Sequence, residues 1–153
     1  MALQIEPDVR DEIKVLNGLI ETCKDGEKGF SEASEKAKDT SLKALFTKYA
    51  VQRRHFAQEL QSAVLQLGGD PADSGHVAAS LHRGWISVKE ALSSDGDTAL
   101  INECESGEDA AMKNYQEALQ QTLSPPIRSL IEHQFAGIQM AHSVVRDLKH
   151  SHQ

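Results

Sequence analysis

The sequence predicts an all-α fold, a four-helix bundle built from two antiparallel helical hairpins. Apolar residues recur every three or four positions through four long segments, and no segment shows the alternation of a β-strand. Only 4 of the 153 residues are proline and 5% are aromatic, a composition that favours helices over a β-sandwich or barrel. The length corresponds to one domain, 1–153, which can bury a core without disulfides or metals.

The first hairpin is expected at about 8–38 and 41–67. Apolar residues follow one line through the first segment, and Glu27 falls on this line rather than on the charged face. The second segment ends at the Gly-Gly-Asp-Pro stretch, 68–71, because glycine supplies a left-handed cap and proline prevents continuation.

About thirty residues separate this hairpin from the next. The pattern at 74–92 predicts a short additional helix within a long crossover, and Trp85 is expected to pack this crossover onto the bundle. The second hairpin is expected at about 98–122 and 125–149, where Ser-Pro-Pro opens the last helix.

A short pattern, Cys-x-x-Gly-Glu, occurs twice, at 23–27 and at 104–108. Glycine within a helix costs about 1 kcal/mol relative to alanine, so its repeated use suggests a structural reason. Each copy is followed one helix later by Gln-x-x-His, at 52–55 and at 139–142. We therefore expect two hairpins related by a pseudo-two-fold axis, with their acidic and imidazole groups facing a shared interior.

This arrangement suggests a candidate metal site. In metal-carrying bundles of the ferritin kind, two helices each supply a Glu and the other two each supply a Glu-x-x-His. The corresponding candidates for iron or manganese are Glu27, His55, Glu108 and His142, with Glu59 and Glu105 as replacements one turn away. At the bridging positions the chain has Gln52 and Gln139, whose neutral amides are weak ligands for a hard cation.

The alternative for the same residues is a polar layer that binds no metal. Buried carboxylates can be satisfied by hydrogen bonds and one ion pair. Arg53, if it turns inward, could pair with Glu27, and Gln134 could join the layer. Cys23 and Cys104 are expected to be small core residues rather than ligands or redox thiols. A third possibility is a small-molecule or signalling module that is centred on His82 and Trp85 in the crossover.

With these residues, the chain resembles a bacterial ferritin-like family of unknown function. The matching stretches are LNGLIETCKDGEKGF at 16–30, RRHFAQEL at 53–60, GGDP at 68–71, LHRGW at 81–85 and ECESGEDAA at 103–111. The resemblance implies a ferritin-like fold and no established activity. A more distant likeness to rubrerythrin-like and ferritin-like di-iron proteins implies ligands at Glu27, His55, Glu108 and His142, with Glu105 as an extra carboxylate. The amides at 52 and 139 depart from that pattern and argue against oxidase, peroxidase or iron-storage activity.

Charge and composition limit the partners. The chain has 16 basic and 23 acidic residues, and its net charge of −7 disfavours nucleic acid. It shows no signal pattern and no run of about 20 apolar residues, so we expect no membrane contact and a cytoplasmic location. The leading hypothesis is a non-catalytic bundle without a cofactor, a stress-related accessory or interaction protein, in the form of a homo-oligomer, most simply a dimer. The alternative is a metal-binding protein or oxidoreductase that uses the Glu and His candidates.

Overall fold

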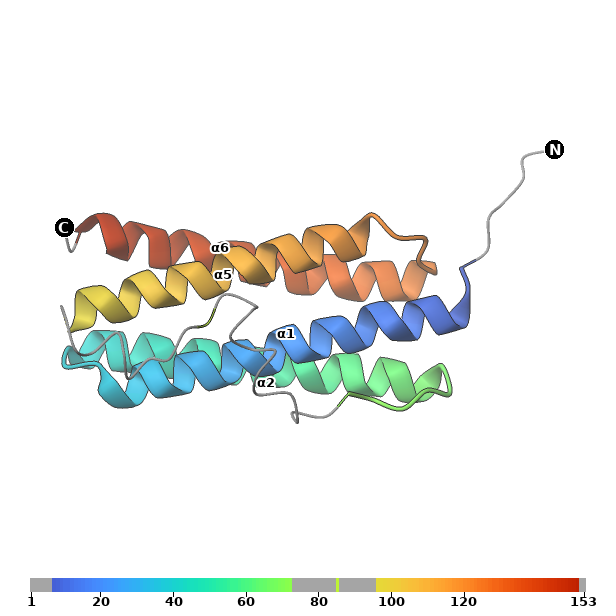
Figure 1. Ribbon diagram of the computed structural model, residues 1–153, viewed down its shortest axis with the longest axis horizontal. Helices are drawn as coiled ribbons and strands as arrows, with labels where there is room; N and C mark the ends of the chain where they lie inside the picture. Colours follow the sequence, from blue (N-terminus) through green and yellow to red (C-terminus); the bar gives the residue numbers. More distant parts are fainter. Residues whose placement is uncertain (1–6, 73–84, 86–95, 152–153) are drawn as a thin grey trace.

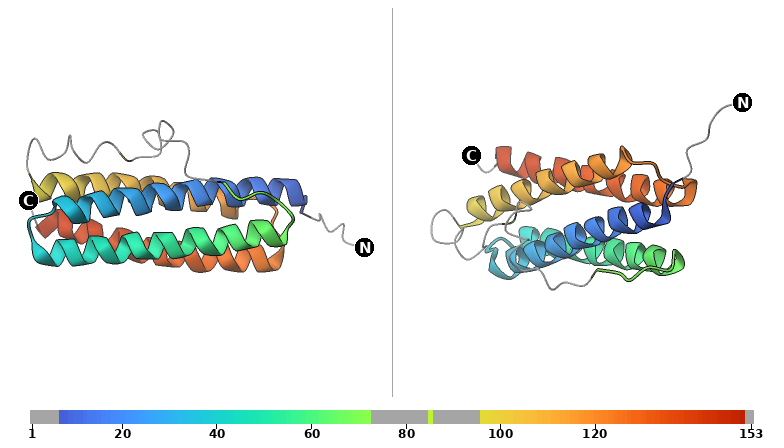
Figure 2. Two further views of the ribbon diagram at one scale, coloured as in Figure 1. Left: turned by 90° about the horizontal axis from the view of Figure 1, so that it is seen from below. Right: turned by 45° about the vertical axis from the view of Figure 1, so that its right-hand side comes forward.

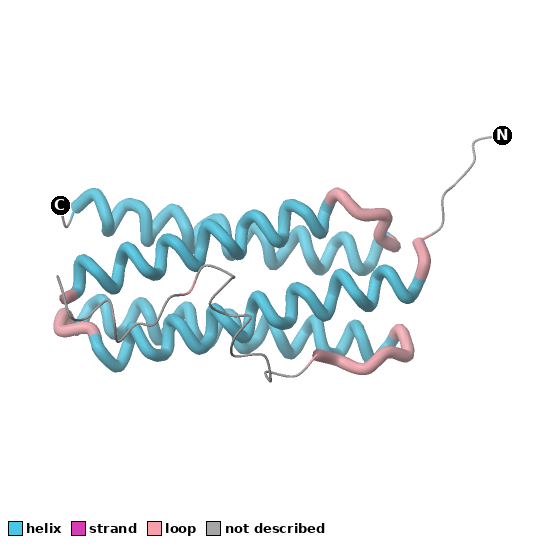
Figure 3. Tube along the Cα trace, viewed as in Figure 1, coloured by secondary structure: helices cyan, strands magenta, loops and turns pink. Residues whose placement is uncertain are grey.

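Four long helices make up nearly all of the described structure, a computed structural model that covers residues 7–72, 85 and 96–151. They are α1 (Val9–Lys36), α2 (Thr40–Gln66), α5 (Asp97–Leu119) and α6 (Pro125–Ser151), and these residues contain no strand (Figures 1 and 3). The predicted all-α four-helix bundle is therefore confirmed. The short helix expected at 74–92 lies outside the described residues, apart from Trp85.

The helix ends follow from local side-chain and backbone chemistry. Asp8 caps α1 by accepting a hydrogen bond from the Arg10 backbone N–H at 2.8 Å, and Asp39 caps α2 in the same way. Gly68 ends α2 with a φ of 83°, the left-handed conformation that glycine adopts without strain. Pro125 opens α6, where its missing N–H leaves no helical hydrogen bond unmade.

The helices are arranged as two antiparallel hairpins. The α1 and α2 helices pack along their lengths, as do α5 and α6, and α1 also lies against α5 in the opposite direction (Figure 2). Contact between α2 and α6 is much less extensive. None of the four described helices combines the length and the hydropathy that crossing a bilayer requires.

A polar layer crosses the middle of the bundle and divides its hydrophobic core. One apolar cluster extends from Leu16 to Cys23 on α1, and the other begins at Phe30 on the same helix. On α2 the corresponding break lies between Ala50 and Ala57, and on α5 it lies between Cys104 and Ala111. The buried residues in these gaps are all polar or glycine, and they form the candidate site.

Candidate functional site

The centre of the polar layer is an ion pair between Arg53 of α2 and Glu108 of α5. Their side chains are 1% and 0% exposed. Arg53 Nη2 donates to Glu108 Oε2 at 2.6 Å, and Nη1 donates to Oε1. The third group, Nε, donates to Oε1 of Gln52 at 3.2 Å. This two-pronged geometry satisfies both carboxylate oxygens, so the guanidinium and the carboxylate neutralise one another inside the core.

Two residues of α1 accommodate this guanidinium: Gly26 leaves space for it, and Phe30 contacts it. A Cβ at Gly26 would lie 3.2 Å from both Cγ and Nη1 of Arg53, so glycine at this position leaves room for the arginine side chain. The ring of Phe30 lies 5.4 Å from the Arg53 Cζ atom and adds a cation–π contact. Burial acts to lower the pKa of Arg53, but the charge and hydrogen bonds of Glu108 outweigh it and raise that pKa above its ordinary value.

A second chain of hydrogen bonds extends the layer to α6. The hydroxyl of Tyr115 donates to Gln134 Oε1 at 2.7 Å and lies 3.1 Å from the Cys23 sulfur. Because that hydroxyl proton is directed to Gln134, the Cys23 thiol acts as the donor to the tyrosine oxygen. Gln134 Nε2 in turn donates to Glu59 Oε1 at 3.1 Å and to the Phe56 carbonyl. No buried side-chain polar atom among the described residues lacks a partner.

Both cysteines are buried and unpaired, as expected for core residues. Burial raises the pKa of the Cys23 thiol to about 11. The pKa of Cys104 also lies well above its ordinary value, first because of burial and then because of nearby carboxylates. Thiols held neutral in this way are poor nucleophiles and poor metal ligands.

Of the candidate ligands in the first hairpin, Glu27 and His55 do not reach this layer, whereas Glu59 meets its edge through Gln134. Glu27 is half-buried and lines a surface groove between α1 and α2. His55 and Glu59 are exposed and line another groove, together with His133 of α6. Successive residues of a helix are rotated by about 100°. Because Arg53 points inward, His55 lies about 200° around α2 and faces outward.

Of the candidate ligands in the second hairpin, only Glu108 lies in the interior. It is the partner of the inward-facing Arg53, in place of Glu27, which the sequence had offered as a possible partner. His142 is half-buried, and its Nε2 lies 2.5 Å from Asp109 Oδ1. Glu105 is ion-paired with Lys149 of α6 at 2.8 Å. Gln139 is exposed and does not occupy a bridging position between the helices. The interior amide of α6 is Gln134, as its position on the apolar face had suggested.

The residues that the structure describes are not grouped as a di-iron centre requires. Within 7–72, 85 and 96–151, no three His, Cys, Asp or Glu side chains are grouped so that they could hold a metal ion. Both oxygens of Glu108 already accept hydrogen bonds from Arg53, and the guanidinium places a positive charge beside them. The six candidate ligands therefore do not form one centre in the described structure.

Two further glycines are explained by Trp85, whose side chain is 7% exposed. A Cβ at Gly29 of α1 would lie 2.2 Å from its ring, and a Cβ at Gly107 of α5 would lie 2.1 Å from it. The indole therefore fills a slot between α1 and α5, where it also meets Phe30 edge-on at 5.3 Å between centroids. His82, the other part of the third hypothesis, lies outside the described residues. The sequence pattern drew attention to Gly107 but offered no sign of its contact with Trp85.

Comparison with known proteins agrees with this fold. Residues 11–121 match the family described as a domain of unknown function, DUF2383. No curated protein is similar enough to count as a match.

Two solved structures share the architecture. One is a dodecameric thioferritin, the bacterioferritin-related protein from Bacteroides fragilis, with a TM-score of 0.80 and 19% identity over 93% of this chain and 86% of that one. The other is a two-domain protein from Anabaena variabilis ATCC 29413, with DJ-1/ThiJ/PfpI-like and ferritin-like domains. It has a TM-score of 0.76 and 13% identity over 96% of this chain but only 38% of that protein. The family match covers most of the chain, and the chain therefore belongs to the DUF2383 family, whose function is unknown, and has a ferritin-like fold.

Proposed function

We propose that this protein is a non-catalytic ferritin-like bundle that acts as an accessory protein through association with other protein surfaces. The observation that carries this proposal is the buried ion pair of Arg53 and Glu108. It lies in the middle of the bundle, the region where ferritin-like di-metal proteins direct their carboxylates and histidines. Here Arg53 and Glu108 occupy that region as a closed ion pair.

The chemistry of the pair supports this proposal over a metal-binding role. A dication needs carboxylate oxygens with free lone pairs, whereas both oxygens of Glu108 accept from the guanidinium. Arginine stays protonated at any physiological pH, so the cation cannot be removed by a proton transfer. Opening this centre to a metal would therefore leave Arg53 buried without its counter-ion, which is energetically costly.

Metal analysis tests the proposal directly. Protein purified from cells supplemented with iron or manganese is expected to contain less than about 0.1 metal ion per chain. Its melting temperature should not rise with added ferrous or manganous ion, because a ligand that binds only the native state stabilises it by RT ln(1 + [L]/Kd). A content near one ion per chain, lost in Glu27→Ala or His142→Ala, would overturn the proposal. Both side chains are partly exposed, so these variants should still fold.

The proposed association includes contact between copies of this chain in the cytoplasm. Met140 and Val144 lie one turn apart on the outer face of α6, 73% and 39% exposed. Apolar groups exposed in this way are candidates for burial against a second chain. Light scattering on wild-type protein should give at least the mass of a dimer, and the Met140→Ser, Val144→Ser double variant should reduce it. A monomeric wild-type protein would rule out self-association.

A further inference from the structure

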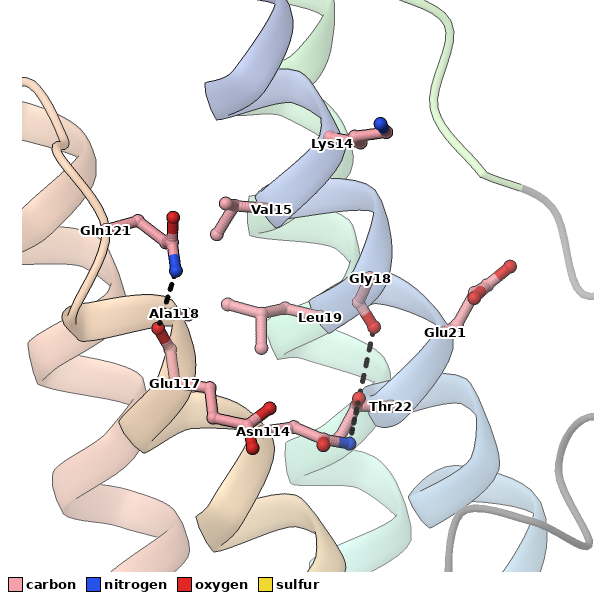
Figure 4. A pocket seen from close by; sticks show the side chains of 10 residues that line it. All are labelled: Lys14, Val15, Gly18, Leu19, Glu21, Thr22, Asn114, Glu117, Ala118 and Gln121. Carbon is pink, nitrogen blue, oxygen red and sulfur yellow. Dashed lines mark hydrogen bonds between the residues drawn. The ribbon is translucent and has the colours of Figure 1, made fainter.

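An open groove runs between α1 and α5 on the side of the polar layer opposite to Trp85. Its volume is about 350 Å³, which is within the range of small-molecule sites. Figure 4 shows its two sides: Val15 and Leu19 project from α1, and Ala118 lies opposite on α5. These three side chains give the groove an apolar floor.

The other edge of the groove is polar, and hydrogen bonds fix the orientation of its side chains. The hydroxyl of Thr22 donates to the Gly18 carbonyl at 3.0 Å, and the amide nitrogen of Asn114 donates to that hydroxyl at 3.0 Å (Figure 4). This bond holds the Asn114 side chain across the groove, with its carbonyl oxygen available as an acceptor. The carboxylate of Glu117 lies beside it and pairs with none of the described residues. The edge therefore presents acceptors and a negative charge.

The two remaining charged residues of the groove do not change this balance. Lys14 and Glu21 stand on the outer edge of α1, and Figure 4 shows both pointing away from α5. They carry opposite charges on one helix. The net charge inside the groove is therefore that of Glu117, which favours a cationic ligand over an anionic one.

The faces of α1 and α5 that enclose Trp85 meet again farther along the same two helices. Gly18 lies 11 residues before Gly29 on α1, and Ala118 lies 11 residues after Gly107 on α5. Eleven residues are about three helical turns, so the same faces meet again at Gly18 and Ala118 in this antiparallel pair. At the first level, the indole of Trp85 occupies the space between the helices. At the second, a Cβ on Gly18 would meet no atom of the described residues within 4 Å.

Packing against the described residues gives no reason for a glycine at position 18. Glycine costs a helix about 1 kcal/mol relative to alanine, and a Cβ would fit here without a clash against the described residues. Its effect is to keep the groove wide and to expose the edge of α1.

We propose that this groove is a binding site for a small aromatic amine. The planar ring lies against Val15 and Leu19 and passes over Gly18, as the Trp85 ring passes over Gly29. The ammonium group points to the Glu117 carboxylate and donates to the carbonyl oxygen of Asn114. The site is separate from the Arg53–Glu108 pair, so it does not depend on the proposed non-catalytic role of that pair.

Titration with tryptamine, followed in ¹H–¹⁵N NMR spectra of the full chain, tests the site. We expect saturable shifts of the Gly18 and Asn114 backbone amides with a Kd of roughly 1 mM, the affinity of a fragment of this size. Indole-3-propionate has the same ring but a carboxylate, and we expect it to bind about tenfold more weakly. Equal binding of the two probes would overturn the role of Glu117. No saturation by either probe, or shifts centred on Gly29 and Gly107, would overturn the site itself.

A variant that fills the groove separates binding from folding. Gly18→Leu places an apolar side chain in the open space and improves helix propensity, so the melting temperature should be maintained or raised while tryptamine binding is lost. The matched control is Gly18→Ala, which adds one methyl group and should keep binding within about twofold. Glu117→Gln should remove the preference for tryptamine over indole-3-propionate. Wild-type affinity in Gly18→Leu would contradict the proposal.

Discussion

Removing the charge of Glu108 is the most direct test of the interior described above. Glu108→Gln preserves the shape of the side chain but leaves the guanidinium of Arg53 buried without a counter-ion. Breaking a buried pair by changing one partner costs about 3–5 kcal/mol. Both side chains are at most 1% exposed, so no solvent is available to reduce that cost. The loss is a large share of the roughly 5–15 kcal/mol by which such a domain is stable.

The assay is urea unfolding followed by circular dichroism at a helical wavelength, with a thermal melt as a second measurement. A change of 1 kcal/mol shifts the melting temperature of a domain of this size by about 2–4 °C, so we expect a decrease of roughly 6–20 °C. The double variant Arg53→Met, Glu108→Leu removes both charges and keeps similar volumes. It should unfold within about 1 kcal/mol of the wild type, or be more stable.

The wild type, Glu108→Gln and the double variant together test whether the Arg53–Glu108 pair is closed to water. If Glu108→Gln loses less than about 1 kcal/mol, Arg53 has access to water or to another carboxylate, and the closed ionic layer does not exist as described. If the double variant is as unstable as the single one, the cost arises from packing and not from an unpaired charge.

Three further predictions follow from other contacts. Gly29→Ala should destabilise the wild type by about 1–3 kcal/mol, because its Cβ overlaps the ring of Trp85. In a Trp85→Ala background the same change should stabilise the protein by up to about 1 kcal/mol, since only the gain in helix propensity remains. Equal effects in both backgrounds, measured by urea unfolding, would contradict the slot. The raised pKa of Cys23, about 11 against an ordinary 9.0, means that the native state holds this proton while the unfolded state loses it. Cys23 should therefore contribute a fall of about 2–3 kcal/mol in the free energy of unfolding as the pH rises from 9 to 11, and Cys23→Ala should make the total fall smaller by that amount. Finally, Glu105→Gln breaks the partly exposed pair with Lys149 and should leave the melting temperature nearly unchanged, in contrast to Glu108→Gln. A comparable loss of stability in both would show that burial is not what makes the interior pair important.

The glycines were only partly interpretable from the sequence. Repetition of Cys-x-x-Gly-Glu correctly indicated that Gly26 and Gly107 have a structural purpose. However, the two copies do different things, because Gly26 makes room for Arg53 and Gly107 makes room for Trp85. Gly29, which lies outside the repeat, forms the other wall of the Trp85 slot. A repeated glycine indicates that space is needed at a position, but it does not identify the side chain that fills this space.

The sequence by itself determined the four helices, the two hairpins and the presence of polar groups on their inner faces, because these depend on local periodicity and on helix caps. It did not determine which polar residue of α2 faces inward. Half-buried Phe56 extends the apolar face of α2 toward His55 and Glu59. The fully inward line of the helix is instead the one that contains Ala50, Arg53 and Ala57, which are all buried. A rotation of α2 about its axis by one or two residue positions decides whether His55 or Arg53 lies in the interior. Only the packing of α2 against α1 and the pairing of Arg53 with Glu108 of α5 decided this, because Glu108 and the space beside Gly26 satisfy the charge and the volume of Arg53.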